Sequence, residues 1–187
     1  MKNWTPDELE MLDKAREGDA DALEKLLRRH EPQIYKFGIR MCRNPEDAED
    51  IMQDTMLAIA RTVRRFQGRS SLSTWLFKIA RSFCIKKRRK GKFEPEEEHV
   101  VDSQIPDHRR DPEEILAAKE IEDVFTQAIR ELDPKYREVF LLRDVEGLSA
   151  PEVSQIVGIP VDTVKTRLHR ARAAVRDKVA PLLGTGN

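Results

Sequence analysis

The stretch from Leu148 to Lys178 constrains the fold of this chain more than any other, because it reads as two helices joined by a tight turn. Ser149 with Glu152 three residues later forms a capping box that begins the first helix. Gly158 and Pro160 end that helix and begin the second. The second helix carries an apolar stripe at steps of three and four residues, at Val161, Val164, Leu168, Ala171 and Val175. The pattern predicts a helix-turn-helix.

The opposite face of the second helix is polar and basic, with six basic and two acidic residues between Val161 and Lys178. A helix of this kind, packed on a shorter one across a three-residue turn, fits the major groove of DNA. A solvated amphipathic helix can also be rich in lysine and arginine. Because the turn, the caps and the one-sided charge agree, we favour DNA binding, through Thr163, Lys165, Thr166, Arg167, His169, Arg170 and Arg172.

Start and stop signals divide the rest of the chain into further helices, and no segment has the alternation of a strand. Pro32 falls inside the expected helix from Ala20 to about Cys42, where it should kink or divide it. Residues 93–111 are acidic, contain two prolines and lack apolar periodicity. We therefore expect an all-α fold of two small helical domains, residues 1–92 and 112–187, joined by a flexible linker at 93–111.

A second informative stretch runs from Gln67 to Lys92, where a short polar loop leads into a helix that mixes aromatic and basic residues. Seven basic residues and no acidic one lie between Arg81 and Lys92. Cations interleaved with aromatic rings suit single-stranded or melting DNA, because phosphates meet lysine and arginine while unstacked bases find ring faces. Alternatively, Trp75 and Phe83 are core residues and the cluster is a solvated helix end. We favour the core for Trp75 alone and nucleic acid for the basic cluster.

The helix expected from Asn44 to about Phe66 has one acidic face, with Asp50, Gln53 and Asp54 beside an exposed Leu57. Acidic residues are also common in the first turn of ordinary helices. A leucine among acids favours a docking face for a basic partner helix.

Several classes of function are disfavoured by what the sequence lacks. It contains no glycine-rich phosphate loop, no metal-ligand spacing and none of the common hydrolase motifs. We therefore expect no enzyme, no metal and no cofactor. The two cysteines, Cys42 and Cys84, are too few for a disulfide framework and are expected as buried thiols. No apolar run approaches the length of a membrane span, so we expect a cytoplasmic protein without direct membrane insertion.

Three segments taken in order resemble the extracytoplasmic-function (ECF) sigma factors of bacterial RNA polymerase, which belong to the sigma-70 family. They are AEDIMQDTMLAIA, RFQGRSSLSTWLFKIARS and LDPKYREVFLLRDVEGLSAPEVSQIVGIPVDTVKTRLHRARAAV, and together they span nearly the whole chain. The resemblance implies that domain 1–92 corresponds to sigma region 2 and domain 112–187 to sigma region 4. It also implies a transcription initiation factor that binds core polymerase and promoter DNA, commonly under the control of an anti-sigma protein.

The resemblance also implies roles for individual residues. Docking on core polymerase, through its largest-subunit coiled coil and its flap, would use an acidic set on the first domain: Asp47, Asp50, Gln53, Asp54 and Leu57. Melting and reading of the minus-ten element would use Phe66, Arg69, Ser70, Ser71, Trp75, Lys78, Arg81 and Ser82. Lys165, Thr166, Arg167, His169 and Arg170 would enter the major groove of the minus-35 element.

One residue departs from the family pattern. Ser82 stands where many relatives carry asparagine, and its single hydroxyl lacks the two-pronged amide that can read a base. Two other functions stay open at this stage: a stand-alone DNA-binding regulator that uses only the second domain, and a helical adaptor that binds an anti-sigma partner without reaching promoter DNA.

Overall fold

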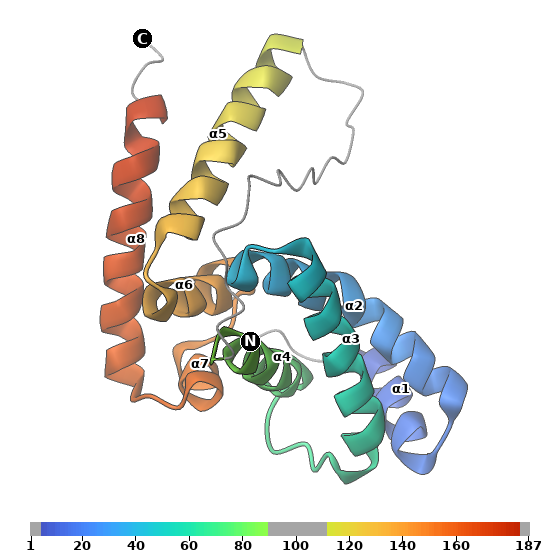
Figure 1. Cartoon of the computed structure of the whole chain (residues 1–187). Helices are drawn as coiled ribbons and strands as arrows, with labels where there is room; N and C mark the ends of the chain where they lie inside the picture. Colours follow the sequence, from blue (N-terminus) through green and yellow to red (C-terminus); the bar gives the residue numbers. More distant parts are fainter. Residues whose placement is uncertain (1–4, 90–111, 184–187) are drawn as a thin grey trace.

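The computed structural model of this chain describes residues 5–89 and 112–183. All its regular elements in those ranges are helical, which confirms the predicted all-α class. Figure 1 shows the helices gathered in two groups, which we call the N-terminal lobe (residues 5–89) and the C-terminal lobe (residues 112–183). The predicted linker at 93–111 lies outside the described residues.

The N-terminal lobe is built from four α-helices and one short 3-10 turn. Each expected capping residue begins its helix: Thr5 and Glu8 form the capping box of α1, Asp19 accepts the Ala22 N–H at 3.0 Å, and Asn44 accepts the Asp47 N–H at 3.0 Å. The elements are α1 (Pro6–Glu17), α2 (Ala20–Cys42), α3 (Pro45–Thr62), η1 (Val63–Arg65) and α4 (Leu72–Arg89).

The core of this lobe lies between α2, α3 and α4. Phe37 of α2 meets Phe77 of α4 edge to face, with ring centroids 5.1 Å apart, and Ile51 of α3 is fully buried in the core. The α2 and α3 backbones cross closely at Gly38, where a Cβ would lie 3.1 Å from the Cα of Ala48. This close packing fixes the direction of α3 and therefore which of its faces meets solvent.

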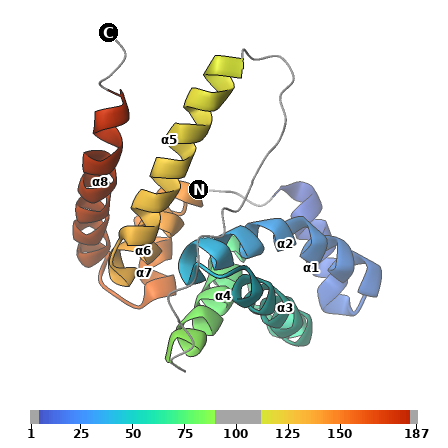
Figure 2. The same ribbon diagram turned by 45° about the horizontal axis from the view of Figure 1, so that its top comes forward.

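The C-terminal lobe packs its last helix against three preceding helices. Val164, Leu168 and Ala171 of that helix are buried, as the apolar spacing predicts. Figures 1 and 2 both show the first and last helices of the lobe running side by side, with the shorter ones at their base. The elements are α5 (Pro112–Glu131), α6 (Pro134–Phe140), the π-helical turn η2 (Leu141–Val145), α7 (Ala150–Val157) and α8 (Val161–Leu183).

Of the two outcomes that the sequence suggested at Pro32, a kinked or a divided helix, the second is wrong. Pro32 lies inside a single helix of 23 residues, which continues on both sides of it. Buried contacts of Ile34 and Phe37 after the proline, and of Leu26 before it, hold both halves to the same core. Tertiary packing therefore outweighs the hydrogen bond that proline removes.

The two lobes touch, chiefly through α4 of the first and α7 of the second. Arg137 of α6 is a buried polar link between the lobes, with 4% of its surface exposed. Its guanidinium donates to the carbonyls of Ile129, Arg130 and Leu132 at 2.6–3.1 Å and to that of Met41 in the other lobe at 3.3 Å. Burial lowers its pKa to about 10, which still leaves the side chain charged at neutral pH.

Candidate nucleic-acid interface

The predicted helix-turn-helix is present as α7, a short turn and α8. Ser149 accepts the Glu152 N–H, and the Glu152 carboxylate accepts the Ser149 N–H at 2.9 Å, so the capping box is complete. Gly158 ends α7 with a φ of 76°, a left-handed conformation that glycine adopts without strain. The Ser154 hydroxyl donates to the Ile159 carbonyl at 2.6 Å and closes the turn. These local contacts fix the angle at which α8 leaves α7.

The predicted DNA-contacting residues of α8 differ in how free they are. Lys165, Thr166, His169 and Arg170 are exposed, whereas Thr163 and Arg167 are partly buried. The Thr166 hydroxyl donates to the Asp162 carbonyl at 2.9 Å, and Lys165 pairs with the Asp162 carboxylate at 3.1 Å. The outer face of α8 therefore offers two cations, a hydroxyl and an imidazole to a partner.

Several arginines of α8 are held by acceptors on preceding elements, which the sequence did not reveal. Arg172 makes a bidentate pair with Asp144 of η2, at 2.6 and 2.7 Å. Arg167 lies 3.7 Å from the carboxylate of Glu138 in α6. Such pairs reduce the rotamer freedom of the arginines and so fix where their charge lies.

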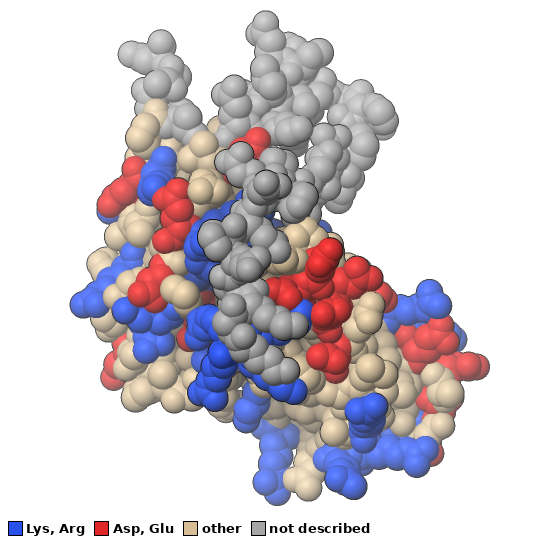
Figure 3. Space-filling view, in the orientation of Figure 1, with Lys and Arg blue, Asp and Glu red and all other residues tan. Residues whose placement is uncertain are grey.

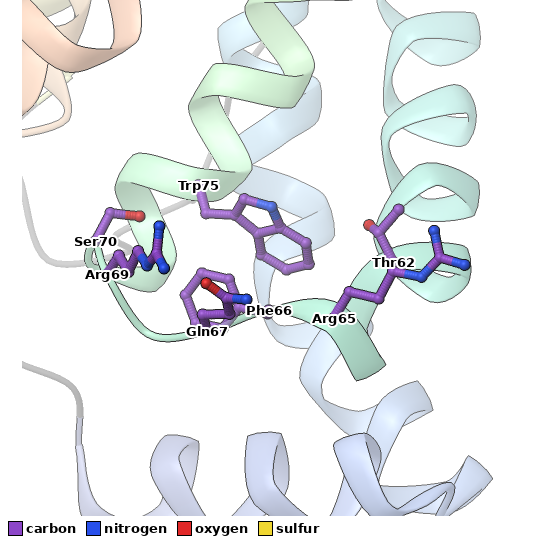
Figure 4. A pocket seen from close by; sticks show the side chains of 7 residues that line it. All are labelled: Thr62, Arg65, Phe66, Gln67, Arg69, Ser70 and Trp75. Atoms are coloured by element: carbon purple, nitrogen blue, oxygen red, sulfur yellow. The ribbon is translucent and has the colours of Figure 1, made fainter.

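In the N-terminal lobe, the loop between η1 and α4 borders an open pocket of about 290 Å³. Figure 4 shows the Trp75 indole standing over the Phe66 ring, with Arg69 on one side and Arg65 on the other, where the Arg65 guanidinium points away from the rings. The two ring centroids are 4.6 Å apart and the planes are inclined by 33°. The full lining is Thr62, Arg65, Phe66, Gln67, Arg69, Ser70 and Trp75.

The predicted minus-ten residues thus fall into three places. Phe66, Arg69, Ser70 and Trp75 line the pocket. Trp75 is only partly buried, and it packs on Phe66 while also forming a pocket wall, so it is both a packing residue and a surface residue. Lys78 and Ser82 are exposed on α4, and the remaining two, Ser71 and Arg81, face the C-terminal lobe.

Three pocket residues were missed by the sequence analysis: Thr62, Arg65 and Gln67. They flank Phe66 in the sequence, and the change from α3 through η1 to the loop brings them around one hollow. Their position next to the predicted loop was the available signal, but only the turn of the chain shows that they face the same side.

The contacts between the lobes involve some of the same residues. The hydroxyls of Ser71 and Thr74 donate to Glu152 at 2.8 and 3.2 Å, and the Arg81 guanidinium donates to Glu138 at 2.9 Å. Burial favours the protonated form of Glu152, but the hydrogen bonds from Ser149, Ser71 and Thr74 outweigh it and lower the pKa of this carboxyl. The helix-turn-helix cap is therefore also a contact with the loop that precedes α4.

The acidic face of α3 is exposed, as predicted, except at its first residue. Figure 3 shows acidic side chains gathered over α3. Asp50, Gln53, Asp54 and Leu57 are exposed, and Leu57 leaves 53% of its surface to solvent. Asp47 is buried and pairs with Lys87 of α4.

Lys87 joins the acidic face to the basic end of α4. Its ammonium also lies 2.8 Å from the Asp50 carboxylate. Burial disfavours the charged amine, but the hydrogen bonds to Asp47 and Asp50 outweigh it and raise the pKa of Lys87. Lys87 therefore partly neutralises the acidic face at Asp47 and Asp50, whereas Asp54 and Leu57 are exposed and lie outside these ion pairs.

Within residues 5–89 and 112–183, no group of three histidine, cysteine or acidic side chains is placed to hold a metal ion. In the same residues no helix is long and apolar enough to cross a bilayer. Cys42 and Cys84 are both buried and unpaired by any disulfide, in agreement with the expectation of buried thiols.

Comparison with known proteins places these surfaces in a family. Residues 26–94 match the family described as Sigma-70 region 2, and residues 122–175 match the one described as Sigma-70, region 4. The ECF RNA polymerase sigma factor SigW of Bacillus subtilis is 34% identical over 175 residues, which cover 89% of this chain and 94% of that protein. The ECF RNA polymerase sigma factor SigE of Mycolicibacterium smegmatis is 30% identical, over 87% of this chain and 65% of its own length.

Solved structures share the same fold. The sigma factor RpoE of Bartonella quintana, in complex with the anti-sigma factor NepR, aligns with a TM-score of 0.66 at 24% identity, over 88% of this chain and 98% of that one. CnrH, in complex with the cytosolic domain of CnrY, aligns with a TM-score of 0.65 at 22% identity, over 97% of this chain and 99% of that one.

Proposed function

This chain belongs to the extracytoplasmic-function sigma factors of the sigma-70 family, and we propose that it divides promoter recognition between its two lobes. Its function is to direct core RNA polymerase to promoters and start transcription there; it is not an enzyme. In the proposal the N-terminal lobe docks on polymerase and reads the minus-ten element, and the C-terminal lobe reads the minus-35 element. Its place of action is the cytoplasm, where polymerase and promoter DNA meet.

The pocket beside Trp75 is the observation that carries the minus-ten assignment. Two aromatic rings form its wall and two arginines, Arg65 and Arg69, stand at its edge. A base that leaves the stack loses a few kcal/mol of stacking and pairing, which a pocket must offset. Ring faces supply stacking of about 1–3 kcal/mol per base, and the arginines neutralise the neighbouring phosphates. The pocket therefore suits one flipped base of the melting strand.

The exposed face of α8 supports the minus-35 assignment. Lys165 and Arg170 are both exposed, so they can exchange their surface contacts with Asp162 and Tyr136 for base edges or phosphates. We expect Lys165→Ala and Arg170→Ala each to weaken binding of the upstream duplex. Arg176→Ala is the matched control, since the Arg176 side chain is 75% exposed on the same helix but lies more than one turn beyond Arg170. Unchanged minus-35 selectivity in both test variants contradicts the assignment.

The acidic face of α3 is assigned to core polymerase. Reversing two exposed charges places like charges against a basic partner helix, which costs several kcal/mol. Asp50→Arg combined with Asp54→Arg is therefore expected to abolish association with core polymerase in a pull-down. Asp13→Arg combined with Glu17→Arg, an exposed pair with the same spacing on α1, is the control. Normal association of the Asp50 and Asp54 variant argues against this docking face.

The test of the whole proposal is a transcription reaction. The purified chain is added to sigma-free core polymerase on genomic DNA, and the new transcription start sites are mapped. The promoter-directing role predicts new starts that disappear with the α3 double variant. A stand-alone regulator would bind DNA without core polymerase and would be unaffected by that variant, and an adaptor would give no new starts at all.

Control by an anti-sigma protein is also part of the proposal. The Bartonella quintana relative has been solved with such a partner. In this chain Ser71 and Arg81 already face the C-terminal lobe, so a partner that holds the lobes together keeps both from promoter DNA. The chain alone is then expected to be more active in transcription than the chain with its inhibitor.

A further inference from the structure

The first turn of α6 and the middle of α8 bring three polar side chains together at the surface of the C-terminal lobe. Arg170 of α8 donates from its Nη1 to the Tyr136 hydroxyl at 3.1 Å. The Lys135 ammonium lies 5.0 Å from the centroid of the Tyr136 ring. Figures 1 and 2 show α6 against α8, which is why residues 34 positions apart in the sequence meet here.

The Tyr136 hydroxyl is held in place but still has a proton to give. Its ring is partly buried against the core of the lobe, which fixes the direction of the C–O bond. The phenol oxygen accepts a hydrogen bond from Arg170, and its own O–H can still donate to another group. The hydrogen bond from Arg170 lowers the pKa of Tyr136, so the O–H is polarised toward donation.

The two cations beside the hydroxyl are accessible. Lys135 and Arg170 are both exposed, and the guanidinium uses one of its five N–H groups on Tyr136. Lys135 also pairs with Asp133 at 3.2 Å, with about half of each side chain exposed to solvent. An exposed pair of this kind contributes little, so Lys135 can exchange the carboxylate for another anion at small cost.

We propose that Lys135, Tyr136 and Arg170 form a binding site for one backbone phosphate of promoter DNA, next to the groove that α8 enters. Two cations and one hydroxyl donor around a single point match a phosphate with its several acceptor oxygens. Of these three residues, only Arg170 was expected from the sequence to contact DNA, in the major groove of the minus-35 element. The site rests on the proposed minus-35 role of α8, and it adds a contact with the strand backbone that fixes the register of the helix in the groove.

The experiment measures DNA affinity of the holoenzyme. The wild-type chain on core polymerase is used to select a duplex from a random pool, and binding to that duplex and to one with its minus-35 segment scrambled is measured over a range of salt concentrations. Tyr136→Phe keeps the ring and removes the hydroxyl, and Lys135→Ala removes one charge. The controls are Tyr35→Phe and Lys25→Ala in α2 of the other lobe, a half-buried tyrosine and an exposed lysine of the same kinds.

A phosphate contact has a distinct signature, because it carries no sequence information. Tyr136→Phe is expected to weaken binding about tenfold, by the same factor on both duplexes. Lys135→Ala is expected to reduce the slope of log affinity against log salt by about 1. A further measurement uses duplexes in which a single phosphate is replaced by a neutral methylphosphonate. At one position this replacement should lower the DNA affinity of the wild-type holoenzyme to that of the Tyr136→Phe holoenzyme.

Two results overturn the proposal while leaving the function of α8 intact: Tyr136→Phe binds like wild type on both duplexes, or its loss is confined to the selected duplex. The second result makes Tyr136 a residue that positions Arg170 on a base. The site is also refuted if no single methylphosphonate makes the wild-type and Tyr136→Phe holoenzymes bind DNA with equal affinity. If the wild-type holoenzyme itself ignores the scrambling, the minus-35 role of α8 fails, and the site, which rests on it, falls with it.

Discussion

Replacing Glu138 by glutamine is expected to increase the affinity of the free chain for DNA. Glu138 has 7% of its side chain exposed and accepts from Arg81 of the other lobe at 2.9 Å, with Arg167 at 3.7 Å on its other oxygen. Both arginines belong to sets that we assign to promoter DNA. One buried carboxylate therefore occupies a cation of each DNA-reading surface in the arrangement described here.

The size of the effect follows from the type of hydrogen bond. A bond to a charged group contributes about 1.5–3 kcal/mol and a neutral one about 0.5–1.5 kcal/mol. Glutamine keeps the shape and one acceptor oxygen but loses the charge, so Arg81 is held less firmly by about 1–1.5 kcal/mol. This is the energy that DNA no longer has to supply, and it corresponds to roughly a 5- to 12-fold gain in affinity.

The assay is fluorescence anisotropy of a labelled single strand with the full-length chain in the absence of polymerase. The gain from Glu138→Gln should vanish in an Arg81→Met background, because Arg81 is then not available to bind the strand. Glu131→Gln is the control, since Glu131 is 42% exposed and pairs with Lys178 within its own lobe. Equal or weaker binding by Glu138→Gln would show that Arg81 is not held back from DNA by this carboxylate.

Three further predictions concern stability. Arg137→Met leaves several buried carbonyls without their donor and should lower the free energy of unfolding, measured in urea, by about 3–5 kcal/mol. Arg176→Met, on the surface, should change this free energy by less than about 0.5 kcal/mol. Similar values for the two variants would refute the role of Arg137. Gly38→Ala places a methyl group 3.1 Å from the backbone of Ala48 and should destabilise the N-terminal lobe by about 1–3 kcal/mol, which an unchanged midpoint would contradict. Because the folded pKa of Glu152 lies below its ordinary value of 4.5, its contribution is present above that pH and is lost as the pH falls through the folded pKa. The stability gap between wild type and Glu152→Gln should therefore shrink below about pH 4.5, and a gap independent of pH argues against the contacts of this carboxylate.

Much of the fold follows from patterns within a few residues. The caps at Thr5, Asp19, Asn44 and Ser149 begin helices where the sequence places them, because each capping oxygen and the N–H that it accepts are only three residues apart. The apolar stripe of α8 is buried from Val164 to Val175, with Val161 partly buried, for the same kind of reason, since its spacing alone puts those residues on one side.

The candidate site was predictable in its parts but not in its connections. The spacing in α3 indicated which acids share a face, but nothing local showed that Lys87 would pair with Asp47 and bury it. The loop at residues 67–71 was identified by composition, while the pocket beside it also needs Thr62 and Arg65, which belong to the end of α3 and to η1. The spacing of residues along one helix shows which of them share a face, whereas a pocket forms only where several elements meet in the folded chain.

The sequence by itself determined where most helices begin, which side of each is apolar and which carries charge, because these depend on neighbours within one or two turns. Only the tertiary structure decided which charged groups meet. Arg81 and Glu138 are 57 residues apart, and Arg137 and Met41 are 96 apart. Contacts over such separations depend on how two finished helical lobes pack, and that packing determines which basic side chains remain available to DNA.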